Sequence, residues 1–147
     1  MKAKKVKVKS KAQVFLERVE MINEIIPNKL IERQQWQDLA LSITANMDGE
    51  RVQSSGTKSK MADAVERCHD MEGEILGAVN KLIAEKQKAV SILEELENPM
   101  EYKILHKRYI QYIDLVDIAV ELNMEYTNVT TTHGRALKHV QEIMDAK

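Results

Sequence analysis

Between residues 59 and 97 the sequence repeats bulky apolar side chains at alternating steps of four and three, and this feature constrains the fold more than any other. Eleven successive positions follow the pattern, and all but two are apolar: Met61, Val65, Cys68, Glu72, Ile75, Val79, Leu82, Lys86, Ala89, Leu93 and Leu96. A heptad repeat of this length predicts one long helix that must cover its apolar stripe with a partner helix. Glu72 and Lys86 are the polar members, and such residues help to fix register at a cost in stability.

A second long segment, residues 11–47, can supply the partner helix. Its bulky apolar residues keep to one helical face: Phe15, Val19, Ile22, Ile26, Trp36, Ala40, Ile43 and Met47. Pro27 is expected to kink or split this helix, because proline lacks the N–H that a helix interior requires. Residues 48–60 are rich in glycine and short polar side chains, which predicts a loop. The two long segments could pair as an antiparallel hairpin within one chain or between the chains of a dimer.

Glycine and proline are scarce, with five and two among 147 residues, which argues against a many-stranded β fold and favours an all-α protein. No run approaches the roughly 18 apolar residues of a membrane span, so no membrane partner is expected. The single cysteine, Cys68, rules out an intrachain disulfide and suits a reducing cytoplasm.

The formal net charge of −1 conceals a basic N-terminus. Residues 1–12 contain six lysines and no acidic residue, whereas residues 13–98 carry 10 basic and 16 acidic side chains. Residues 1–12 are expected to form a flexible basic tail, which either contacts nucleic-acid phosphates without sequence preference or serves only solubility. The acidic middle is a poor nucleic-acid surface and suits protein contacts better.

Asn98-Pro99 marks the clearest boundary, because proline restricts the residue before it and suits the first turn of a new helix. Beyond it, apolar spacing predicts three helices at about 99–112, 115–122 and 126–145. The expected organisation is therefore a basic tail (1–12), a long helical hairpin or coiled coil (13–98) and a three-helix domain (99–147). Residues 13–97 are a candidate homo-oligomerisation region.

A short helix, a three-residue turn and a second helix form a helix-turn-helix unit. Ala119 supplies the small residue that close helix packing needs, Met124 is the apolar residue of the turn, and Val129 lies on the inner face of the second helix. Asn123 tolerates the left-handed conformation that ends a helix.

These residues resemble a known module, region 4 of sigma-70-type factors. The matching pattern is Leu105-x-x-Arg108-Tyr109, Leu115-x-x-Ile118-Ala119-x-x-Leu122, Val129 and Arg135-Ala136-Leu137. The whole chain is similar to a family of phage and prophage proteins from Gram-positive bacteria, grouped with ArpU-like and RinA-like regulators, which share a loop like Val52-Gln53-Ser54-Ser55. The resemblance implies a transcriptional regulator that binds double-stranded DNA, with host RNA polymerase as a candidate partner.

In a helix-turn-helix the N-terminal part of the second helix enters the major groove. Carrying the motif over places five side chains on this reading face: Tyr126, Thr127, Asn128, Thr130 and Thr131. Arg135 and Lys138, farther along the helix, and Arg108 on the first helix are expected near phosphates. The alternative is that these residues form an ordinary solvated helix surface.

Other functions have less support in the sequence. Glu66-x-x-His69 matches half of a di-iron motif without a second copy, so no metal or other cofactor is expected. No hydroxyl has an identifiable base and orienting acid, so the chain is not expected to be an enzyme. The main alternative is a phage assembly adaptor, such as a terminase-small-subunit-like oligomer, which also combines a helix-turn-helix with oligomerising helices.

Overall fold

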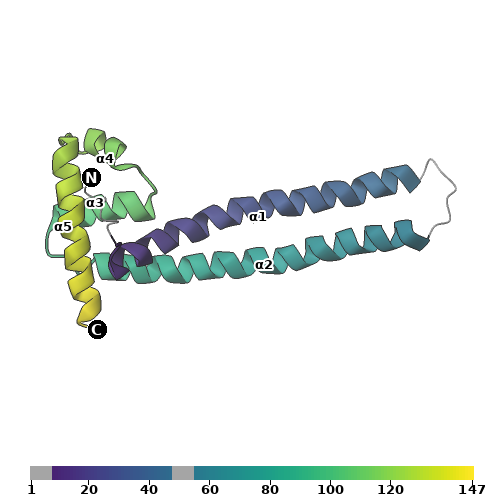
Figure 1. The fold of residues 1–147 in the computed structure, drawn as a ribbon, viewed down its shortest axis with the longest axis horizontal. Helices are drawn as coiled ribbons and strands as arrows, with labels where there is room; N and C mark the ends of the chain where they lie inside the picture. Colours follow the sequence, from purple (N-terminus) through teal and green to yellow (C-terminus); the bar gives the residue numbers. More distant parts are fainter. Residues whose placement is uncertain (1–7, 48–54) are drawn as a thin grey trace, which may run out of the picture. The chain divides into compact units, whose positions relative to one another are not determined.

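The computed structural model describes residues 8–47 and 55–147, and all regular structure in these ranges is helical. The elements are α1 (Lys11–Met47), α2 (Ser55–Leu93), α3 (Pro99–Leu105), a π-helical turn (His106–Ile110), α4 (Leu115–Glu121) and α5 (Tyr126–Asp145) (Figure 1). The predicted all-α fold class is confirmed. Within the described residues, no helix combines the length and apolar character that a membrane crossing requires.

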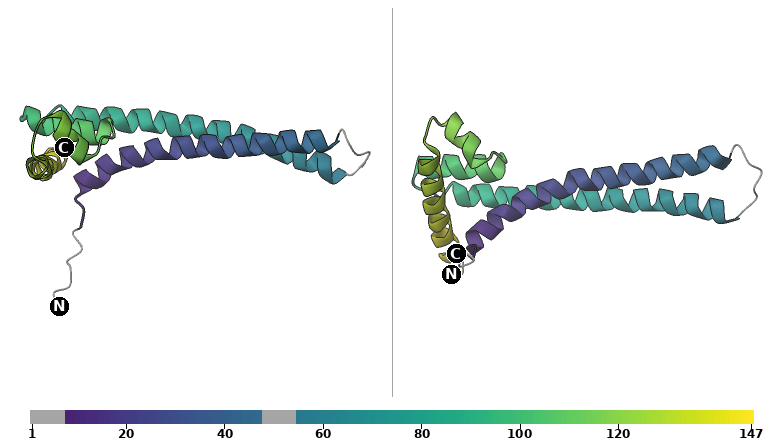
Figure 2. Two further views of the ribbon diagram at one scale, coloured as in Figure 1. Left: turned by 90° about the horizontal axis from the view of Figure 1, so that it is seen from above. Right: turned by 45° about the horizontal axis from the view of Figure 1, so that its top comes forward.

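Helices α1 and α2 lie side by side and run in opposite directions, which confirms a hairpin within one chain (Figures 1 and 2). Polar contacts set the register of their outer part: Lys29 pairs with Glu74 at 3.2 Å, and Arg33 pairs with Glu72. The Sγ atom of Cys68 lies 3.8 Å from the backbone oxygen of Arg33. Cys68 therefore faces α1, as the heptad pattern predicts.

The chain divides into two compact units. One comprises the chain up to Met21 together with Ile83–Lys147, and the other comprises Ile22–Leu82. Asn98-Pro99 marks a change of helix, but the compact units divide inside the two long helices. The reason is that the start of α1 and the end of α2 pack in the same unit as the C-terminal helices.

Pro27 does not split α1, which continues through it, so the expectation of two separate helices is wrong. Pro27 is exposed, and the carbonyl of Asn23 that loses its helical donor can therefore be solvated. The expected loop at 48–60 is also shorter, because α2 already begins at Ser55. Residues 48–54, which include most of the Val52-Gln53-Ser54-Ser55 motif, and residues 1–7 of the basic tail lie outside the described residues.

The buried stripe of α2 departs from a strict heptad in the outer unit. Ala64 and Met71 are buried there, whereas the predicted seam positions Val65 and Glu72 are exposed. An α-helix has 3.6 residues per turn, so its inward face drifts relative to a repeat of 3.5. Helix α2 ends at Leu93, four residues before the expected end at about 97.

Asn98 and Pro99 begin α3 as predicted. The Asn98 side chain accepts hydrogen bonds from the backbone N–H groups of Met100 (2.9 Å) and Glu101 (3.5 Å), and Pro99 occupies the first turn. The expected helix over 99–112 is instead α-helical only to Leu105 and then widens into the π-helical turn. The chain leaves this turn through Tyr112, which has a positive φ of 61°.

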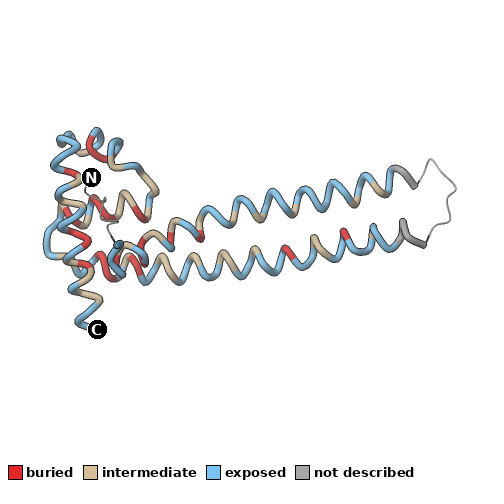
Figure 3. The backbone as a smooth tube through the Cα atoms, in the orientation of Figure 1, coloured by how far each residue is buried: buried red, intermediate tan, exposed pale blue. Residues whose placement is uncertain are grey.

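The corner between α4 and α5 has the predicted geometry. Asn123 adopts the left-handed conformation with a φ of 52°, and the Met124 N–H donates to the Ala119 carbonyl at 2.9 Å. The buried cluster beneath this corner contains Ile104, Ile118, Ala119 and Val129, with Met100, Ile113, Leu115, Leu122 and Met124 packed around it. Figure 3 shows buried positions on each of the helices α3, α4 and α5. Two short helices therefore meet at a tight turn over a closed apolar core.

Candidate nucleic-acid interface

The leading turn of α5 is exposed on one side and anchored on the other. Tyr126 is 52% exposed, and Thr127 and Asn128 are also exposed, whereas Val129 is fully buried in the core cluster. Because Val129 fixes the rotation of the helix, the three polar side chains before it face solvent. This is the arrangement that an inserted recognition helix requires.

Thr130 and Thr131 continue this surface with a defined hydrogen-bonding state. Both hydroxyl groups donate to the carbonyl of Thr127, at 2.9 Å and 2.8 Å. Each hydroxyl has therefore used its one proton and keeps only acceptor capacity. Thr131 is exposed and Thr130 is half-buried. The surface thus offers hydroxyl acceptors, methyl groups and the amide of Asn128.

Glu125 stands at the N-cap of α5, where its side chain makes no capping hydrogen bond. Its charge therefore lies beside the reading face without a role in ending the helix. An anionic side chain at this place disfavours close approach of phosphate, so the face needs positive charge from elsewhere.

A buried aromatic pair holds the middle of α5. The Tyr109 hydroxyl and the Nε2 atom of His133 lie 2.8 Å apart, and the two rings are stacked with centroids 5.7 Å apart. Burial lowers the pKa of His133 and raises the pKa of Tyr109 to about 12. His133 is therefore neutral near pH 7 and accepts the tyrosine proton. It supports α5 through its contact with Tyr109, and it also lines the groove that contains Lys9 and Lys138.

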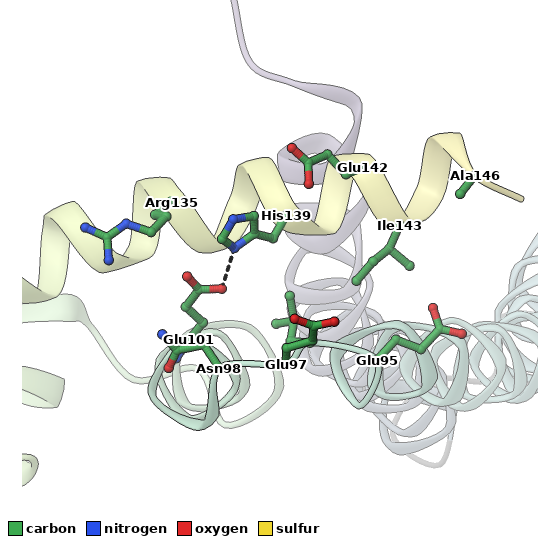
Figure 4. A pocket seen from close by; sticks show the side chains of 10 residues that line it. Glu95, Glu97, Asn98, Glu101, Arg135, His139, Glu142, Ile143 and Ala146 are labelled. Carbon is green, nitrogen blue, oxygen red and sulfur yellow. Dashed lines mark hydrogen bonds and ion pairs between the residues drawn. The ribbon is translucent and has the colours of Figure 1, made fainter.

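A second polar anchor joins the far part of α5 to α3. His139 Nδ1 lies 2.7 Å from Glu101 Oε2, and Glu101 is only 1% exposed. The hydrogen bond to Glu101 raises the pKa of His139. Arg135 precedes His139 by one turn and lines the same acidic pocket of about 570 Å³ (Figure 4). Arg135 is exposed, and four glutamates line this pocket with it.

Arg108 does not join the reading face. Its guanidinium contacts both carboxylate oxygens of Glu20 on α1, at 3.2 Å and 3.1 Å, and the side chain is 24% exposed. Neighbouring Lys107 is similarly paired with Glu121 at 2.8 Å. Both cations of this segment are therefore paired with carboxylates of the same chain, and the role of Arg108 near phosphate stays a prediction. Sequence alone gave no signal for this, because Glu20 lies 88 residues away.

The N-terminal segment lies beside the reading face. Val8, Lys9 and Ser10 line one groove together with Thr131 and Lys138 of α5. The start of α1 is tied to α5 by a hydrogen bond from the backbone N–H of Ala12 to the side-chain oxygen of Gln141, 2.9 Å long. Lys9, from the lysine-rich stretch, and Lys138 thus line the same groove, and the Lys9 ammonium pairs with Glu17 at 2.9 Å. No sequence pattern predicted this arrangement.

The predicted residues thus fall into three groups. The leading edge of α5 gathers Tyr126, Thr127, Asn128, Thr130 and Thr131 on consecutive turns. Arg135 and Lys138 extend this surface along the same helix, both exposed. Arg108 lies apart from it.

No family model, curated protein or solved structure matches the chain in comparisons with known proteins.

Proposed function

We propose that residues 99–147 bind double-stranded DNA by placing the N-terminal half of α5 in the major groove. The observation that carries this proposal is the orientation of α5, with Val129 buried and Tyr126, Thr127 and Asn128 exposed after a tight turn. A helix held in this way presents its first turns as a projecting edge, which is the part that reads bases in helix-turn-helix proteins.

The chemistry of this edge favours A·T base pairs. The Asn128 amide can donate to N7 and accept from N6 of adenine, and threonine methyl groups can pack against the thymine methyl group. Because Thr130 and Thr131 have used their hydroxyl protons internally, they can only accept hydrogen bonds from a base. The proposed target is therefore rich in adenine and thymine at the positions that α5 contacts.

Phosphate contacts come mainly from outside the first turns of α5. Lys138 and Lys9 lie along one groove, and Lys9 belongs to the stretch of six lysines in residues 1–12. A basic arm beside the reading helix adds affinity that does not depend on sequence and falls steeply with salt. We propose that this arm compensates for the few cations of the reading face.

The biological role follows from the resemblance of the sequence to phage and prophage regulators. We propose a non-enzymatic regulator of phage or prophage transcription that acts in the cytoplasm without a cofactor. Its module resembles the part of a sigma factor that reads promoter DNA, and we propose that the long helices hold a protein partner such as host RNA polymerase.

The proposal is tested with duplexes selected from random sequence by the purified full chain. Asn128→Ala should weaken binding to the selected site by about 1–3 kcal/mol and relax the preference for adenine at one position. Asn80→Ala is the matched control, because Asn80 is an exposed asparagine on α2. Fluorescence anisotropy titrations measure both. Equal affinities for the two variants, with unchanged base preference, would contradict the proposed reading face.

A further inference from the structure

The hairpin segment 22–82 buries too little of its own apolar surface to be complete. Among its described residues, the buried hydrophobic side chains are Ile22, Ala64 and Met71. The large hydrophobic side chains that remain exposed are Ile25, Leu30, Ile31, Trp36, Leu39, Leu41, Val65 and Leu76. Other apolar seam residues, such as Ile26, Ile75 and Val79, are only half-buried, so a further partner on this surface would remove additional apolar area from water.

Four of the exposed residues share one side of the hairpin. Leu30 and Leu41 stand three residues before and eight residues after Arg33, which contacts α2. Val65 and Leu76 stand at the same two offsets from Cys68, which contacts α1. Each offset corresponds to a rotation of about 60–80° around the helix axis, measured from the direction in which Arg33 or Cys68 faces the other helix. Because the helices are antiparallel, equal rotations point to the same side.

These four residues form two apolar pairs at different heights. The contacts of Lys29 with Glu74 (3.2 Å) and of Thr44 with Met61 (3.5 Å) set the register of the helices. Leu30 therefore lies within about three residues of the height of Leu76, and Leu41 likewise lies near Val65. The pairs are separated by 11 residues on each helix, or about 16 Å. The four side chains are 49% to 62% exposed.

Polar residues with matching chemistry lie between the two apolar pairs. On α1 they are Gln34 and Gln37, and on α2 they are His69 and Glu72, again at equal offsets from Arg33 and Cys68. The His69 side chain is 85% exposed and the Glu72 side chain 50%. Gln34 donates to Asp38 at 2.9 Å, which leaves its amide oxygen free to accept another hydrogen bond. We call these eight residues the self-complementary face.

We propose that the occupant of the self-complementary face is a second copy of the same hairpin, packed antiparallel as a four-helix bundle. A two-fold axis relates the two copies. It crosses α1 between Gln34 and Gln37 and crosses α2 between His69 and Glu72, so it exchanges the two apolar pairs. Leu30 then meets Leu41 of the second copy, and the same operation brings Val65 onto Leu76 of the second copy. Apolar side chains therefore cover apolar side chains at both heights.

The same axis matches the polar residues. Gln34 meets Gln37 of the second copy, where two amides can exchange hydrogen bonds. His69 meets Glu72 of the second copy, so each interface contains two pairings of an imidazole with a carboxylate. Glu72 already contacts Arg33, and its second oxygen faces the His69 side, 3.9 Å from His69 of its own chain. An unrelated partner would match both sets of residues only by coincidence, which favours a second copy.

Sedimentation velocity over a range of concentrations tests the association. The full chain of 16.9 kDa should sediment as a dimer, and Leu41→Glu should raise its dissociation constant by about tenfold or more, because a carboxylate cannot be buried against Leu30. Leu39→Glu is the matched control, since Leu39 is 46% exposed and lies six residues after Arg33, a rotation of about 120° to the other side of α1. Helicity by circular dichroism confirms that both variants fold. A monomeric parent, or equal weakening by the two variants, would overturn the proposal.

Disulfide trapping tests the register. One chain carries Leu30→Cys and another carries Leu41→Cys, both with Cys68→Ala to remove the native thiol. Oxidation of the mixture should give a covalent dimer, whereas each chain alone should not, because identical positions lie about 16 Å apart across the axis. Cross-linking of each chain with itself, or none in the mixture, would overturn the antiparallel register. Neither test involves DNA, so its failure is distinct from failure of the proposed function.

Discussion

The C-terminal helices and the hairpin segment 22–82 are built from similar helix-forming sequence but satisfy their apolar surface differently. In the first, the short helices α3, α4 and α5 close around Ile104, Ile118 and Val129, which are all fully buried. In the second, the two helical stretches 22–47 and 55–82 leave most of their large apolar side chains partly exposed. Three helices can enclose an apolar core, whereas two helices bury side chains only along the line where they pack together.

This difference separates the sources of stability in the two regions. Each fully buried aliphatic side chain contributes about 1.5–3 kcal/mol, and the C-terminal region collects several in one cluster. The hairpin relies on a narrow seam and on ion pairs such as Lys29–Glu74, which is partly exposed. Exposed pairs of this kind contribute about 0–1 kcal/mol each. The reading helix therefore rests on the more strongly packed of the two regions.

The largest effect should come from the C-terminal core. Ile118→Ala removes methylene and methyl groups from a closed cluster and should lower the free energy of unfolding by about 2–5 kcal/mol. Val120→Ala, two residues along the same helix and 77% exposed, should change it by about 0.5 kcal/mol or less. Chemical denaturation followed by circular dichroism measures both. Similar losses in the two variants would show that this region lacks the packed core described above.

A smaller effect is expected at the hairpin seam. Met71 is fully buried there, but the two-helix seam can close around a smaller side chain, so Met71→Ala should cost about 2 kcal/mol, the low end for such changes. Trp36 is the single tryptophan and lies on α1 within this segment, so its fluorescence reports on the hairpin. A loss above that of Ile118→Ala would reverse the comparison between the two regions.

The smallest effect concerns the dependence of stability on pH. Burial depresses the pKa of His133 below its ordinary value of 6.5, so the unfolded chain binds a proton that the folded chain resists. The free energy of unfolding should therefore fall as the pH drops below 6.5 towards the folded pKa, and stay unaffected by this group above 6.5. His133→Gln keeps an acceptor for Tyr109 and should reduce this acid sensitivity. Denaturation at pH 7.5 and 5 measures the difference, and identical pH dependence would contradict the assignment.

The opposite pKa shift of His139 gives that experiment an internal reference. Its hydrogen bond to Glu101 raises the folded pKa, so the stabilisation it provides is complete below 6.5 and disappears as the pH rises through the folded value. His139 remains in the His133→Gln variant, so its contribution cancels in the comparison. The difference between the two proteins therefore isolates His133.

Local patterns predicted the parts of the fold that depend on neighbours in sequence. The Asn98-Pro99 boundary, the left-handed Asn123 and the buried Val129 follow from capping, turn and spacing rules, and all three are found. Sequence patterns gave wrong predictions in the long helices, where small differences in rotation per residue add up along the helix. Pro27 did not split α1, and the inward face of α2 shifted from Val65 to Ala64.

The candidate site also has features that local sequence patterns predicted and features that they did not. The exposed residues at the start of α5 were predictable, because one buried residue at a known helical offset determines which neighbours face solvent. The sequence by itself determined the helical class, the α4–α5 corner and the chemistry of the exposed side chains at the start of α5. Only the tertiary structure decided that Arg108 is held by Glu20 and that Lys9 and Lys138 line one groove, because the residues of each pair are about 90 to 130 positions apart and local spacing carries no information about them.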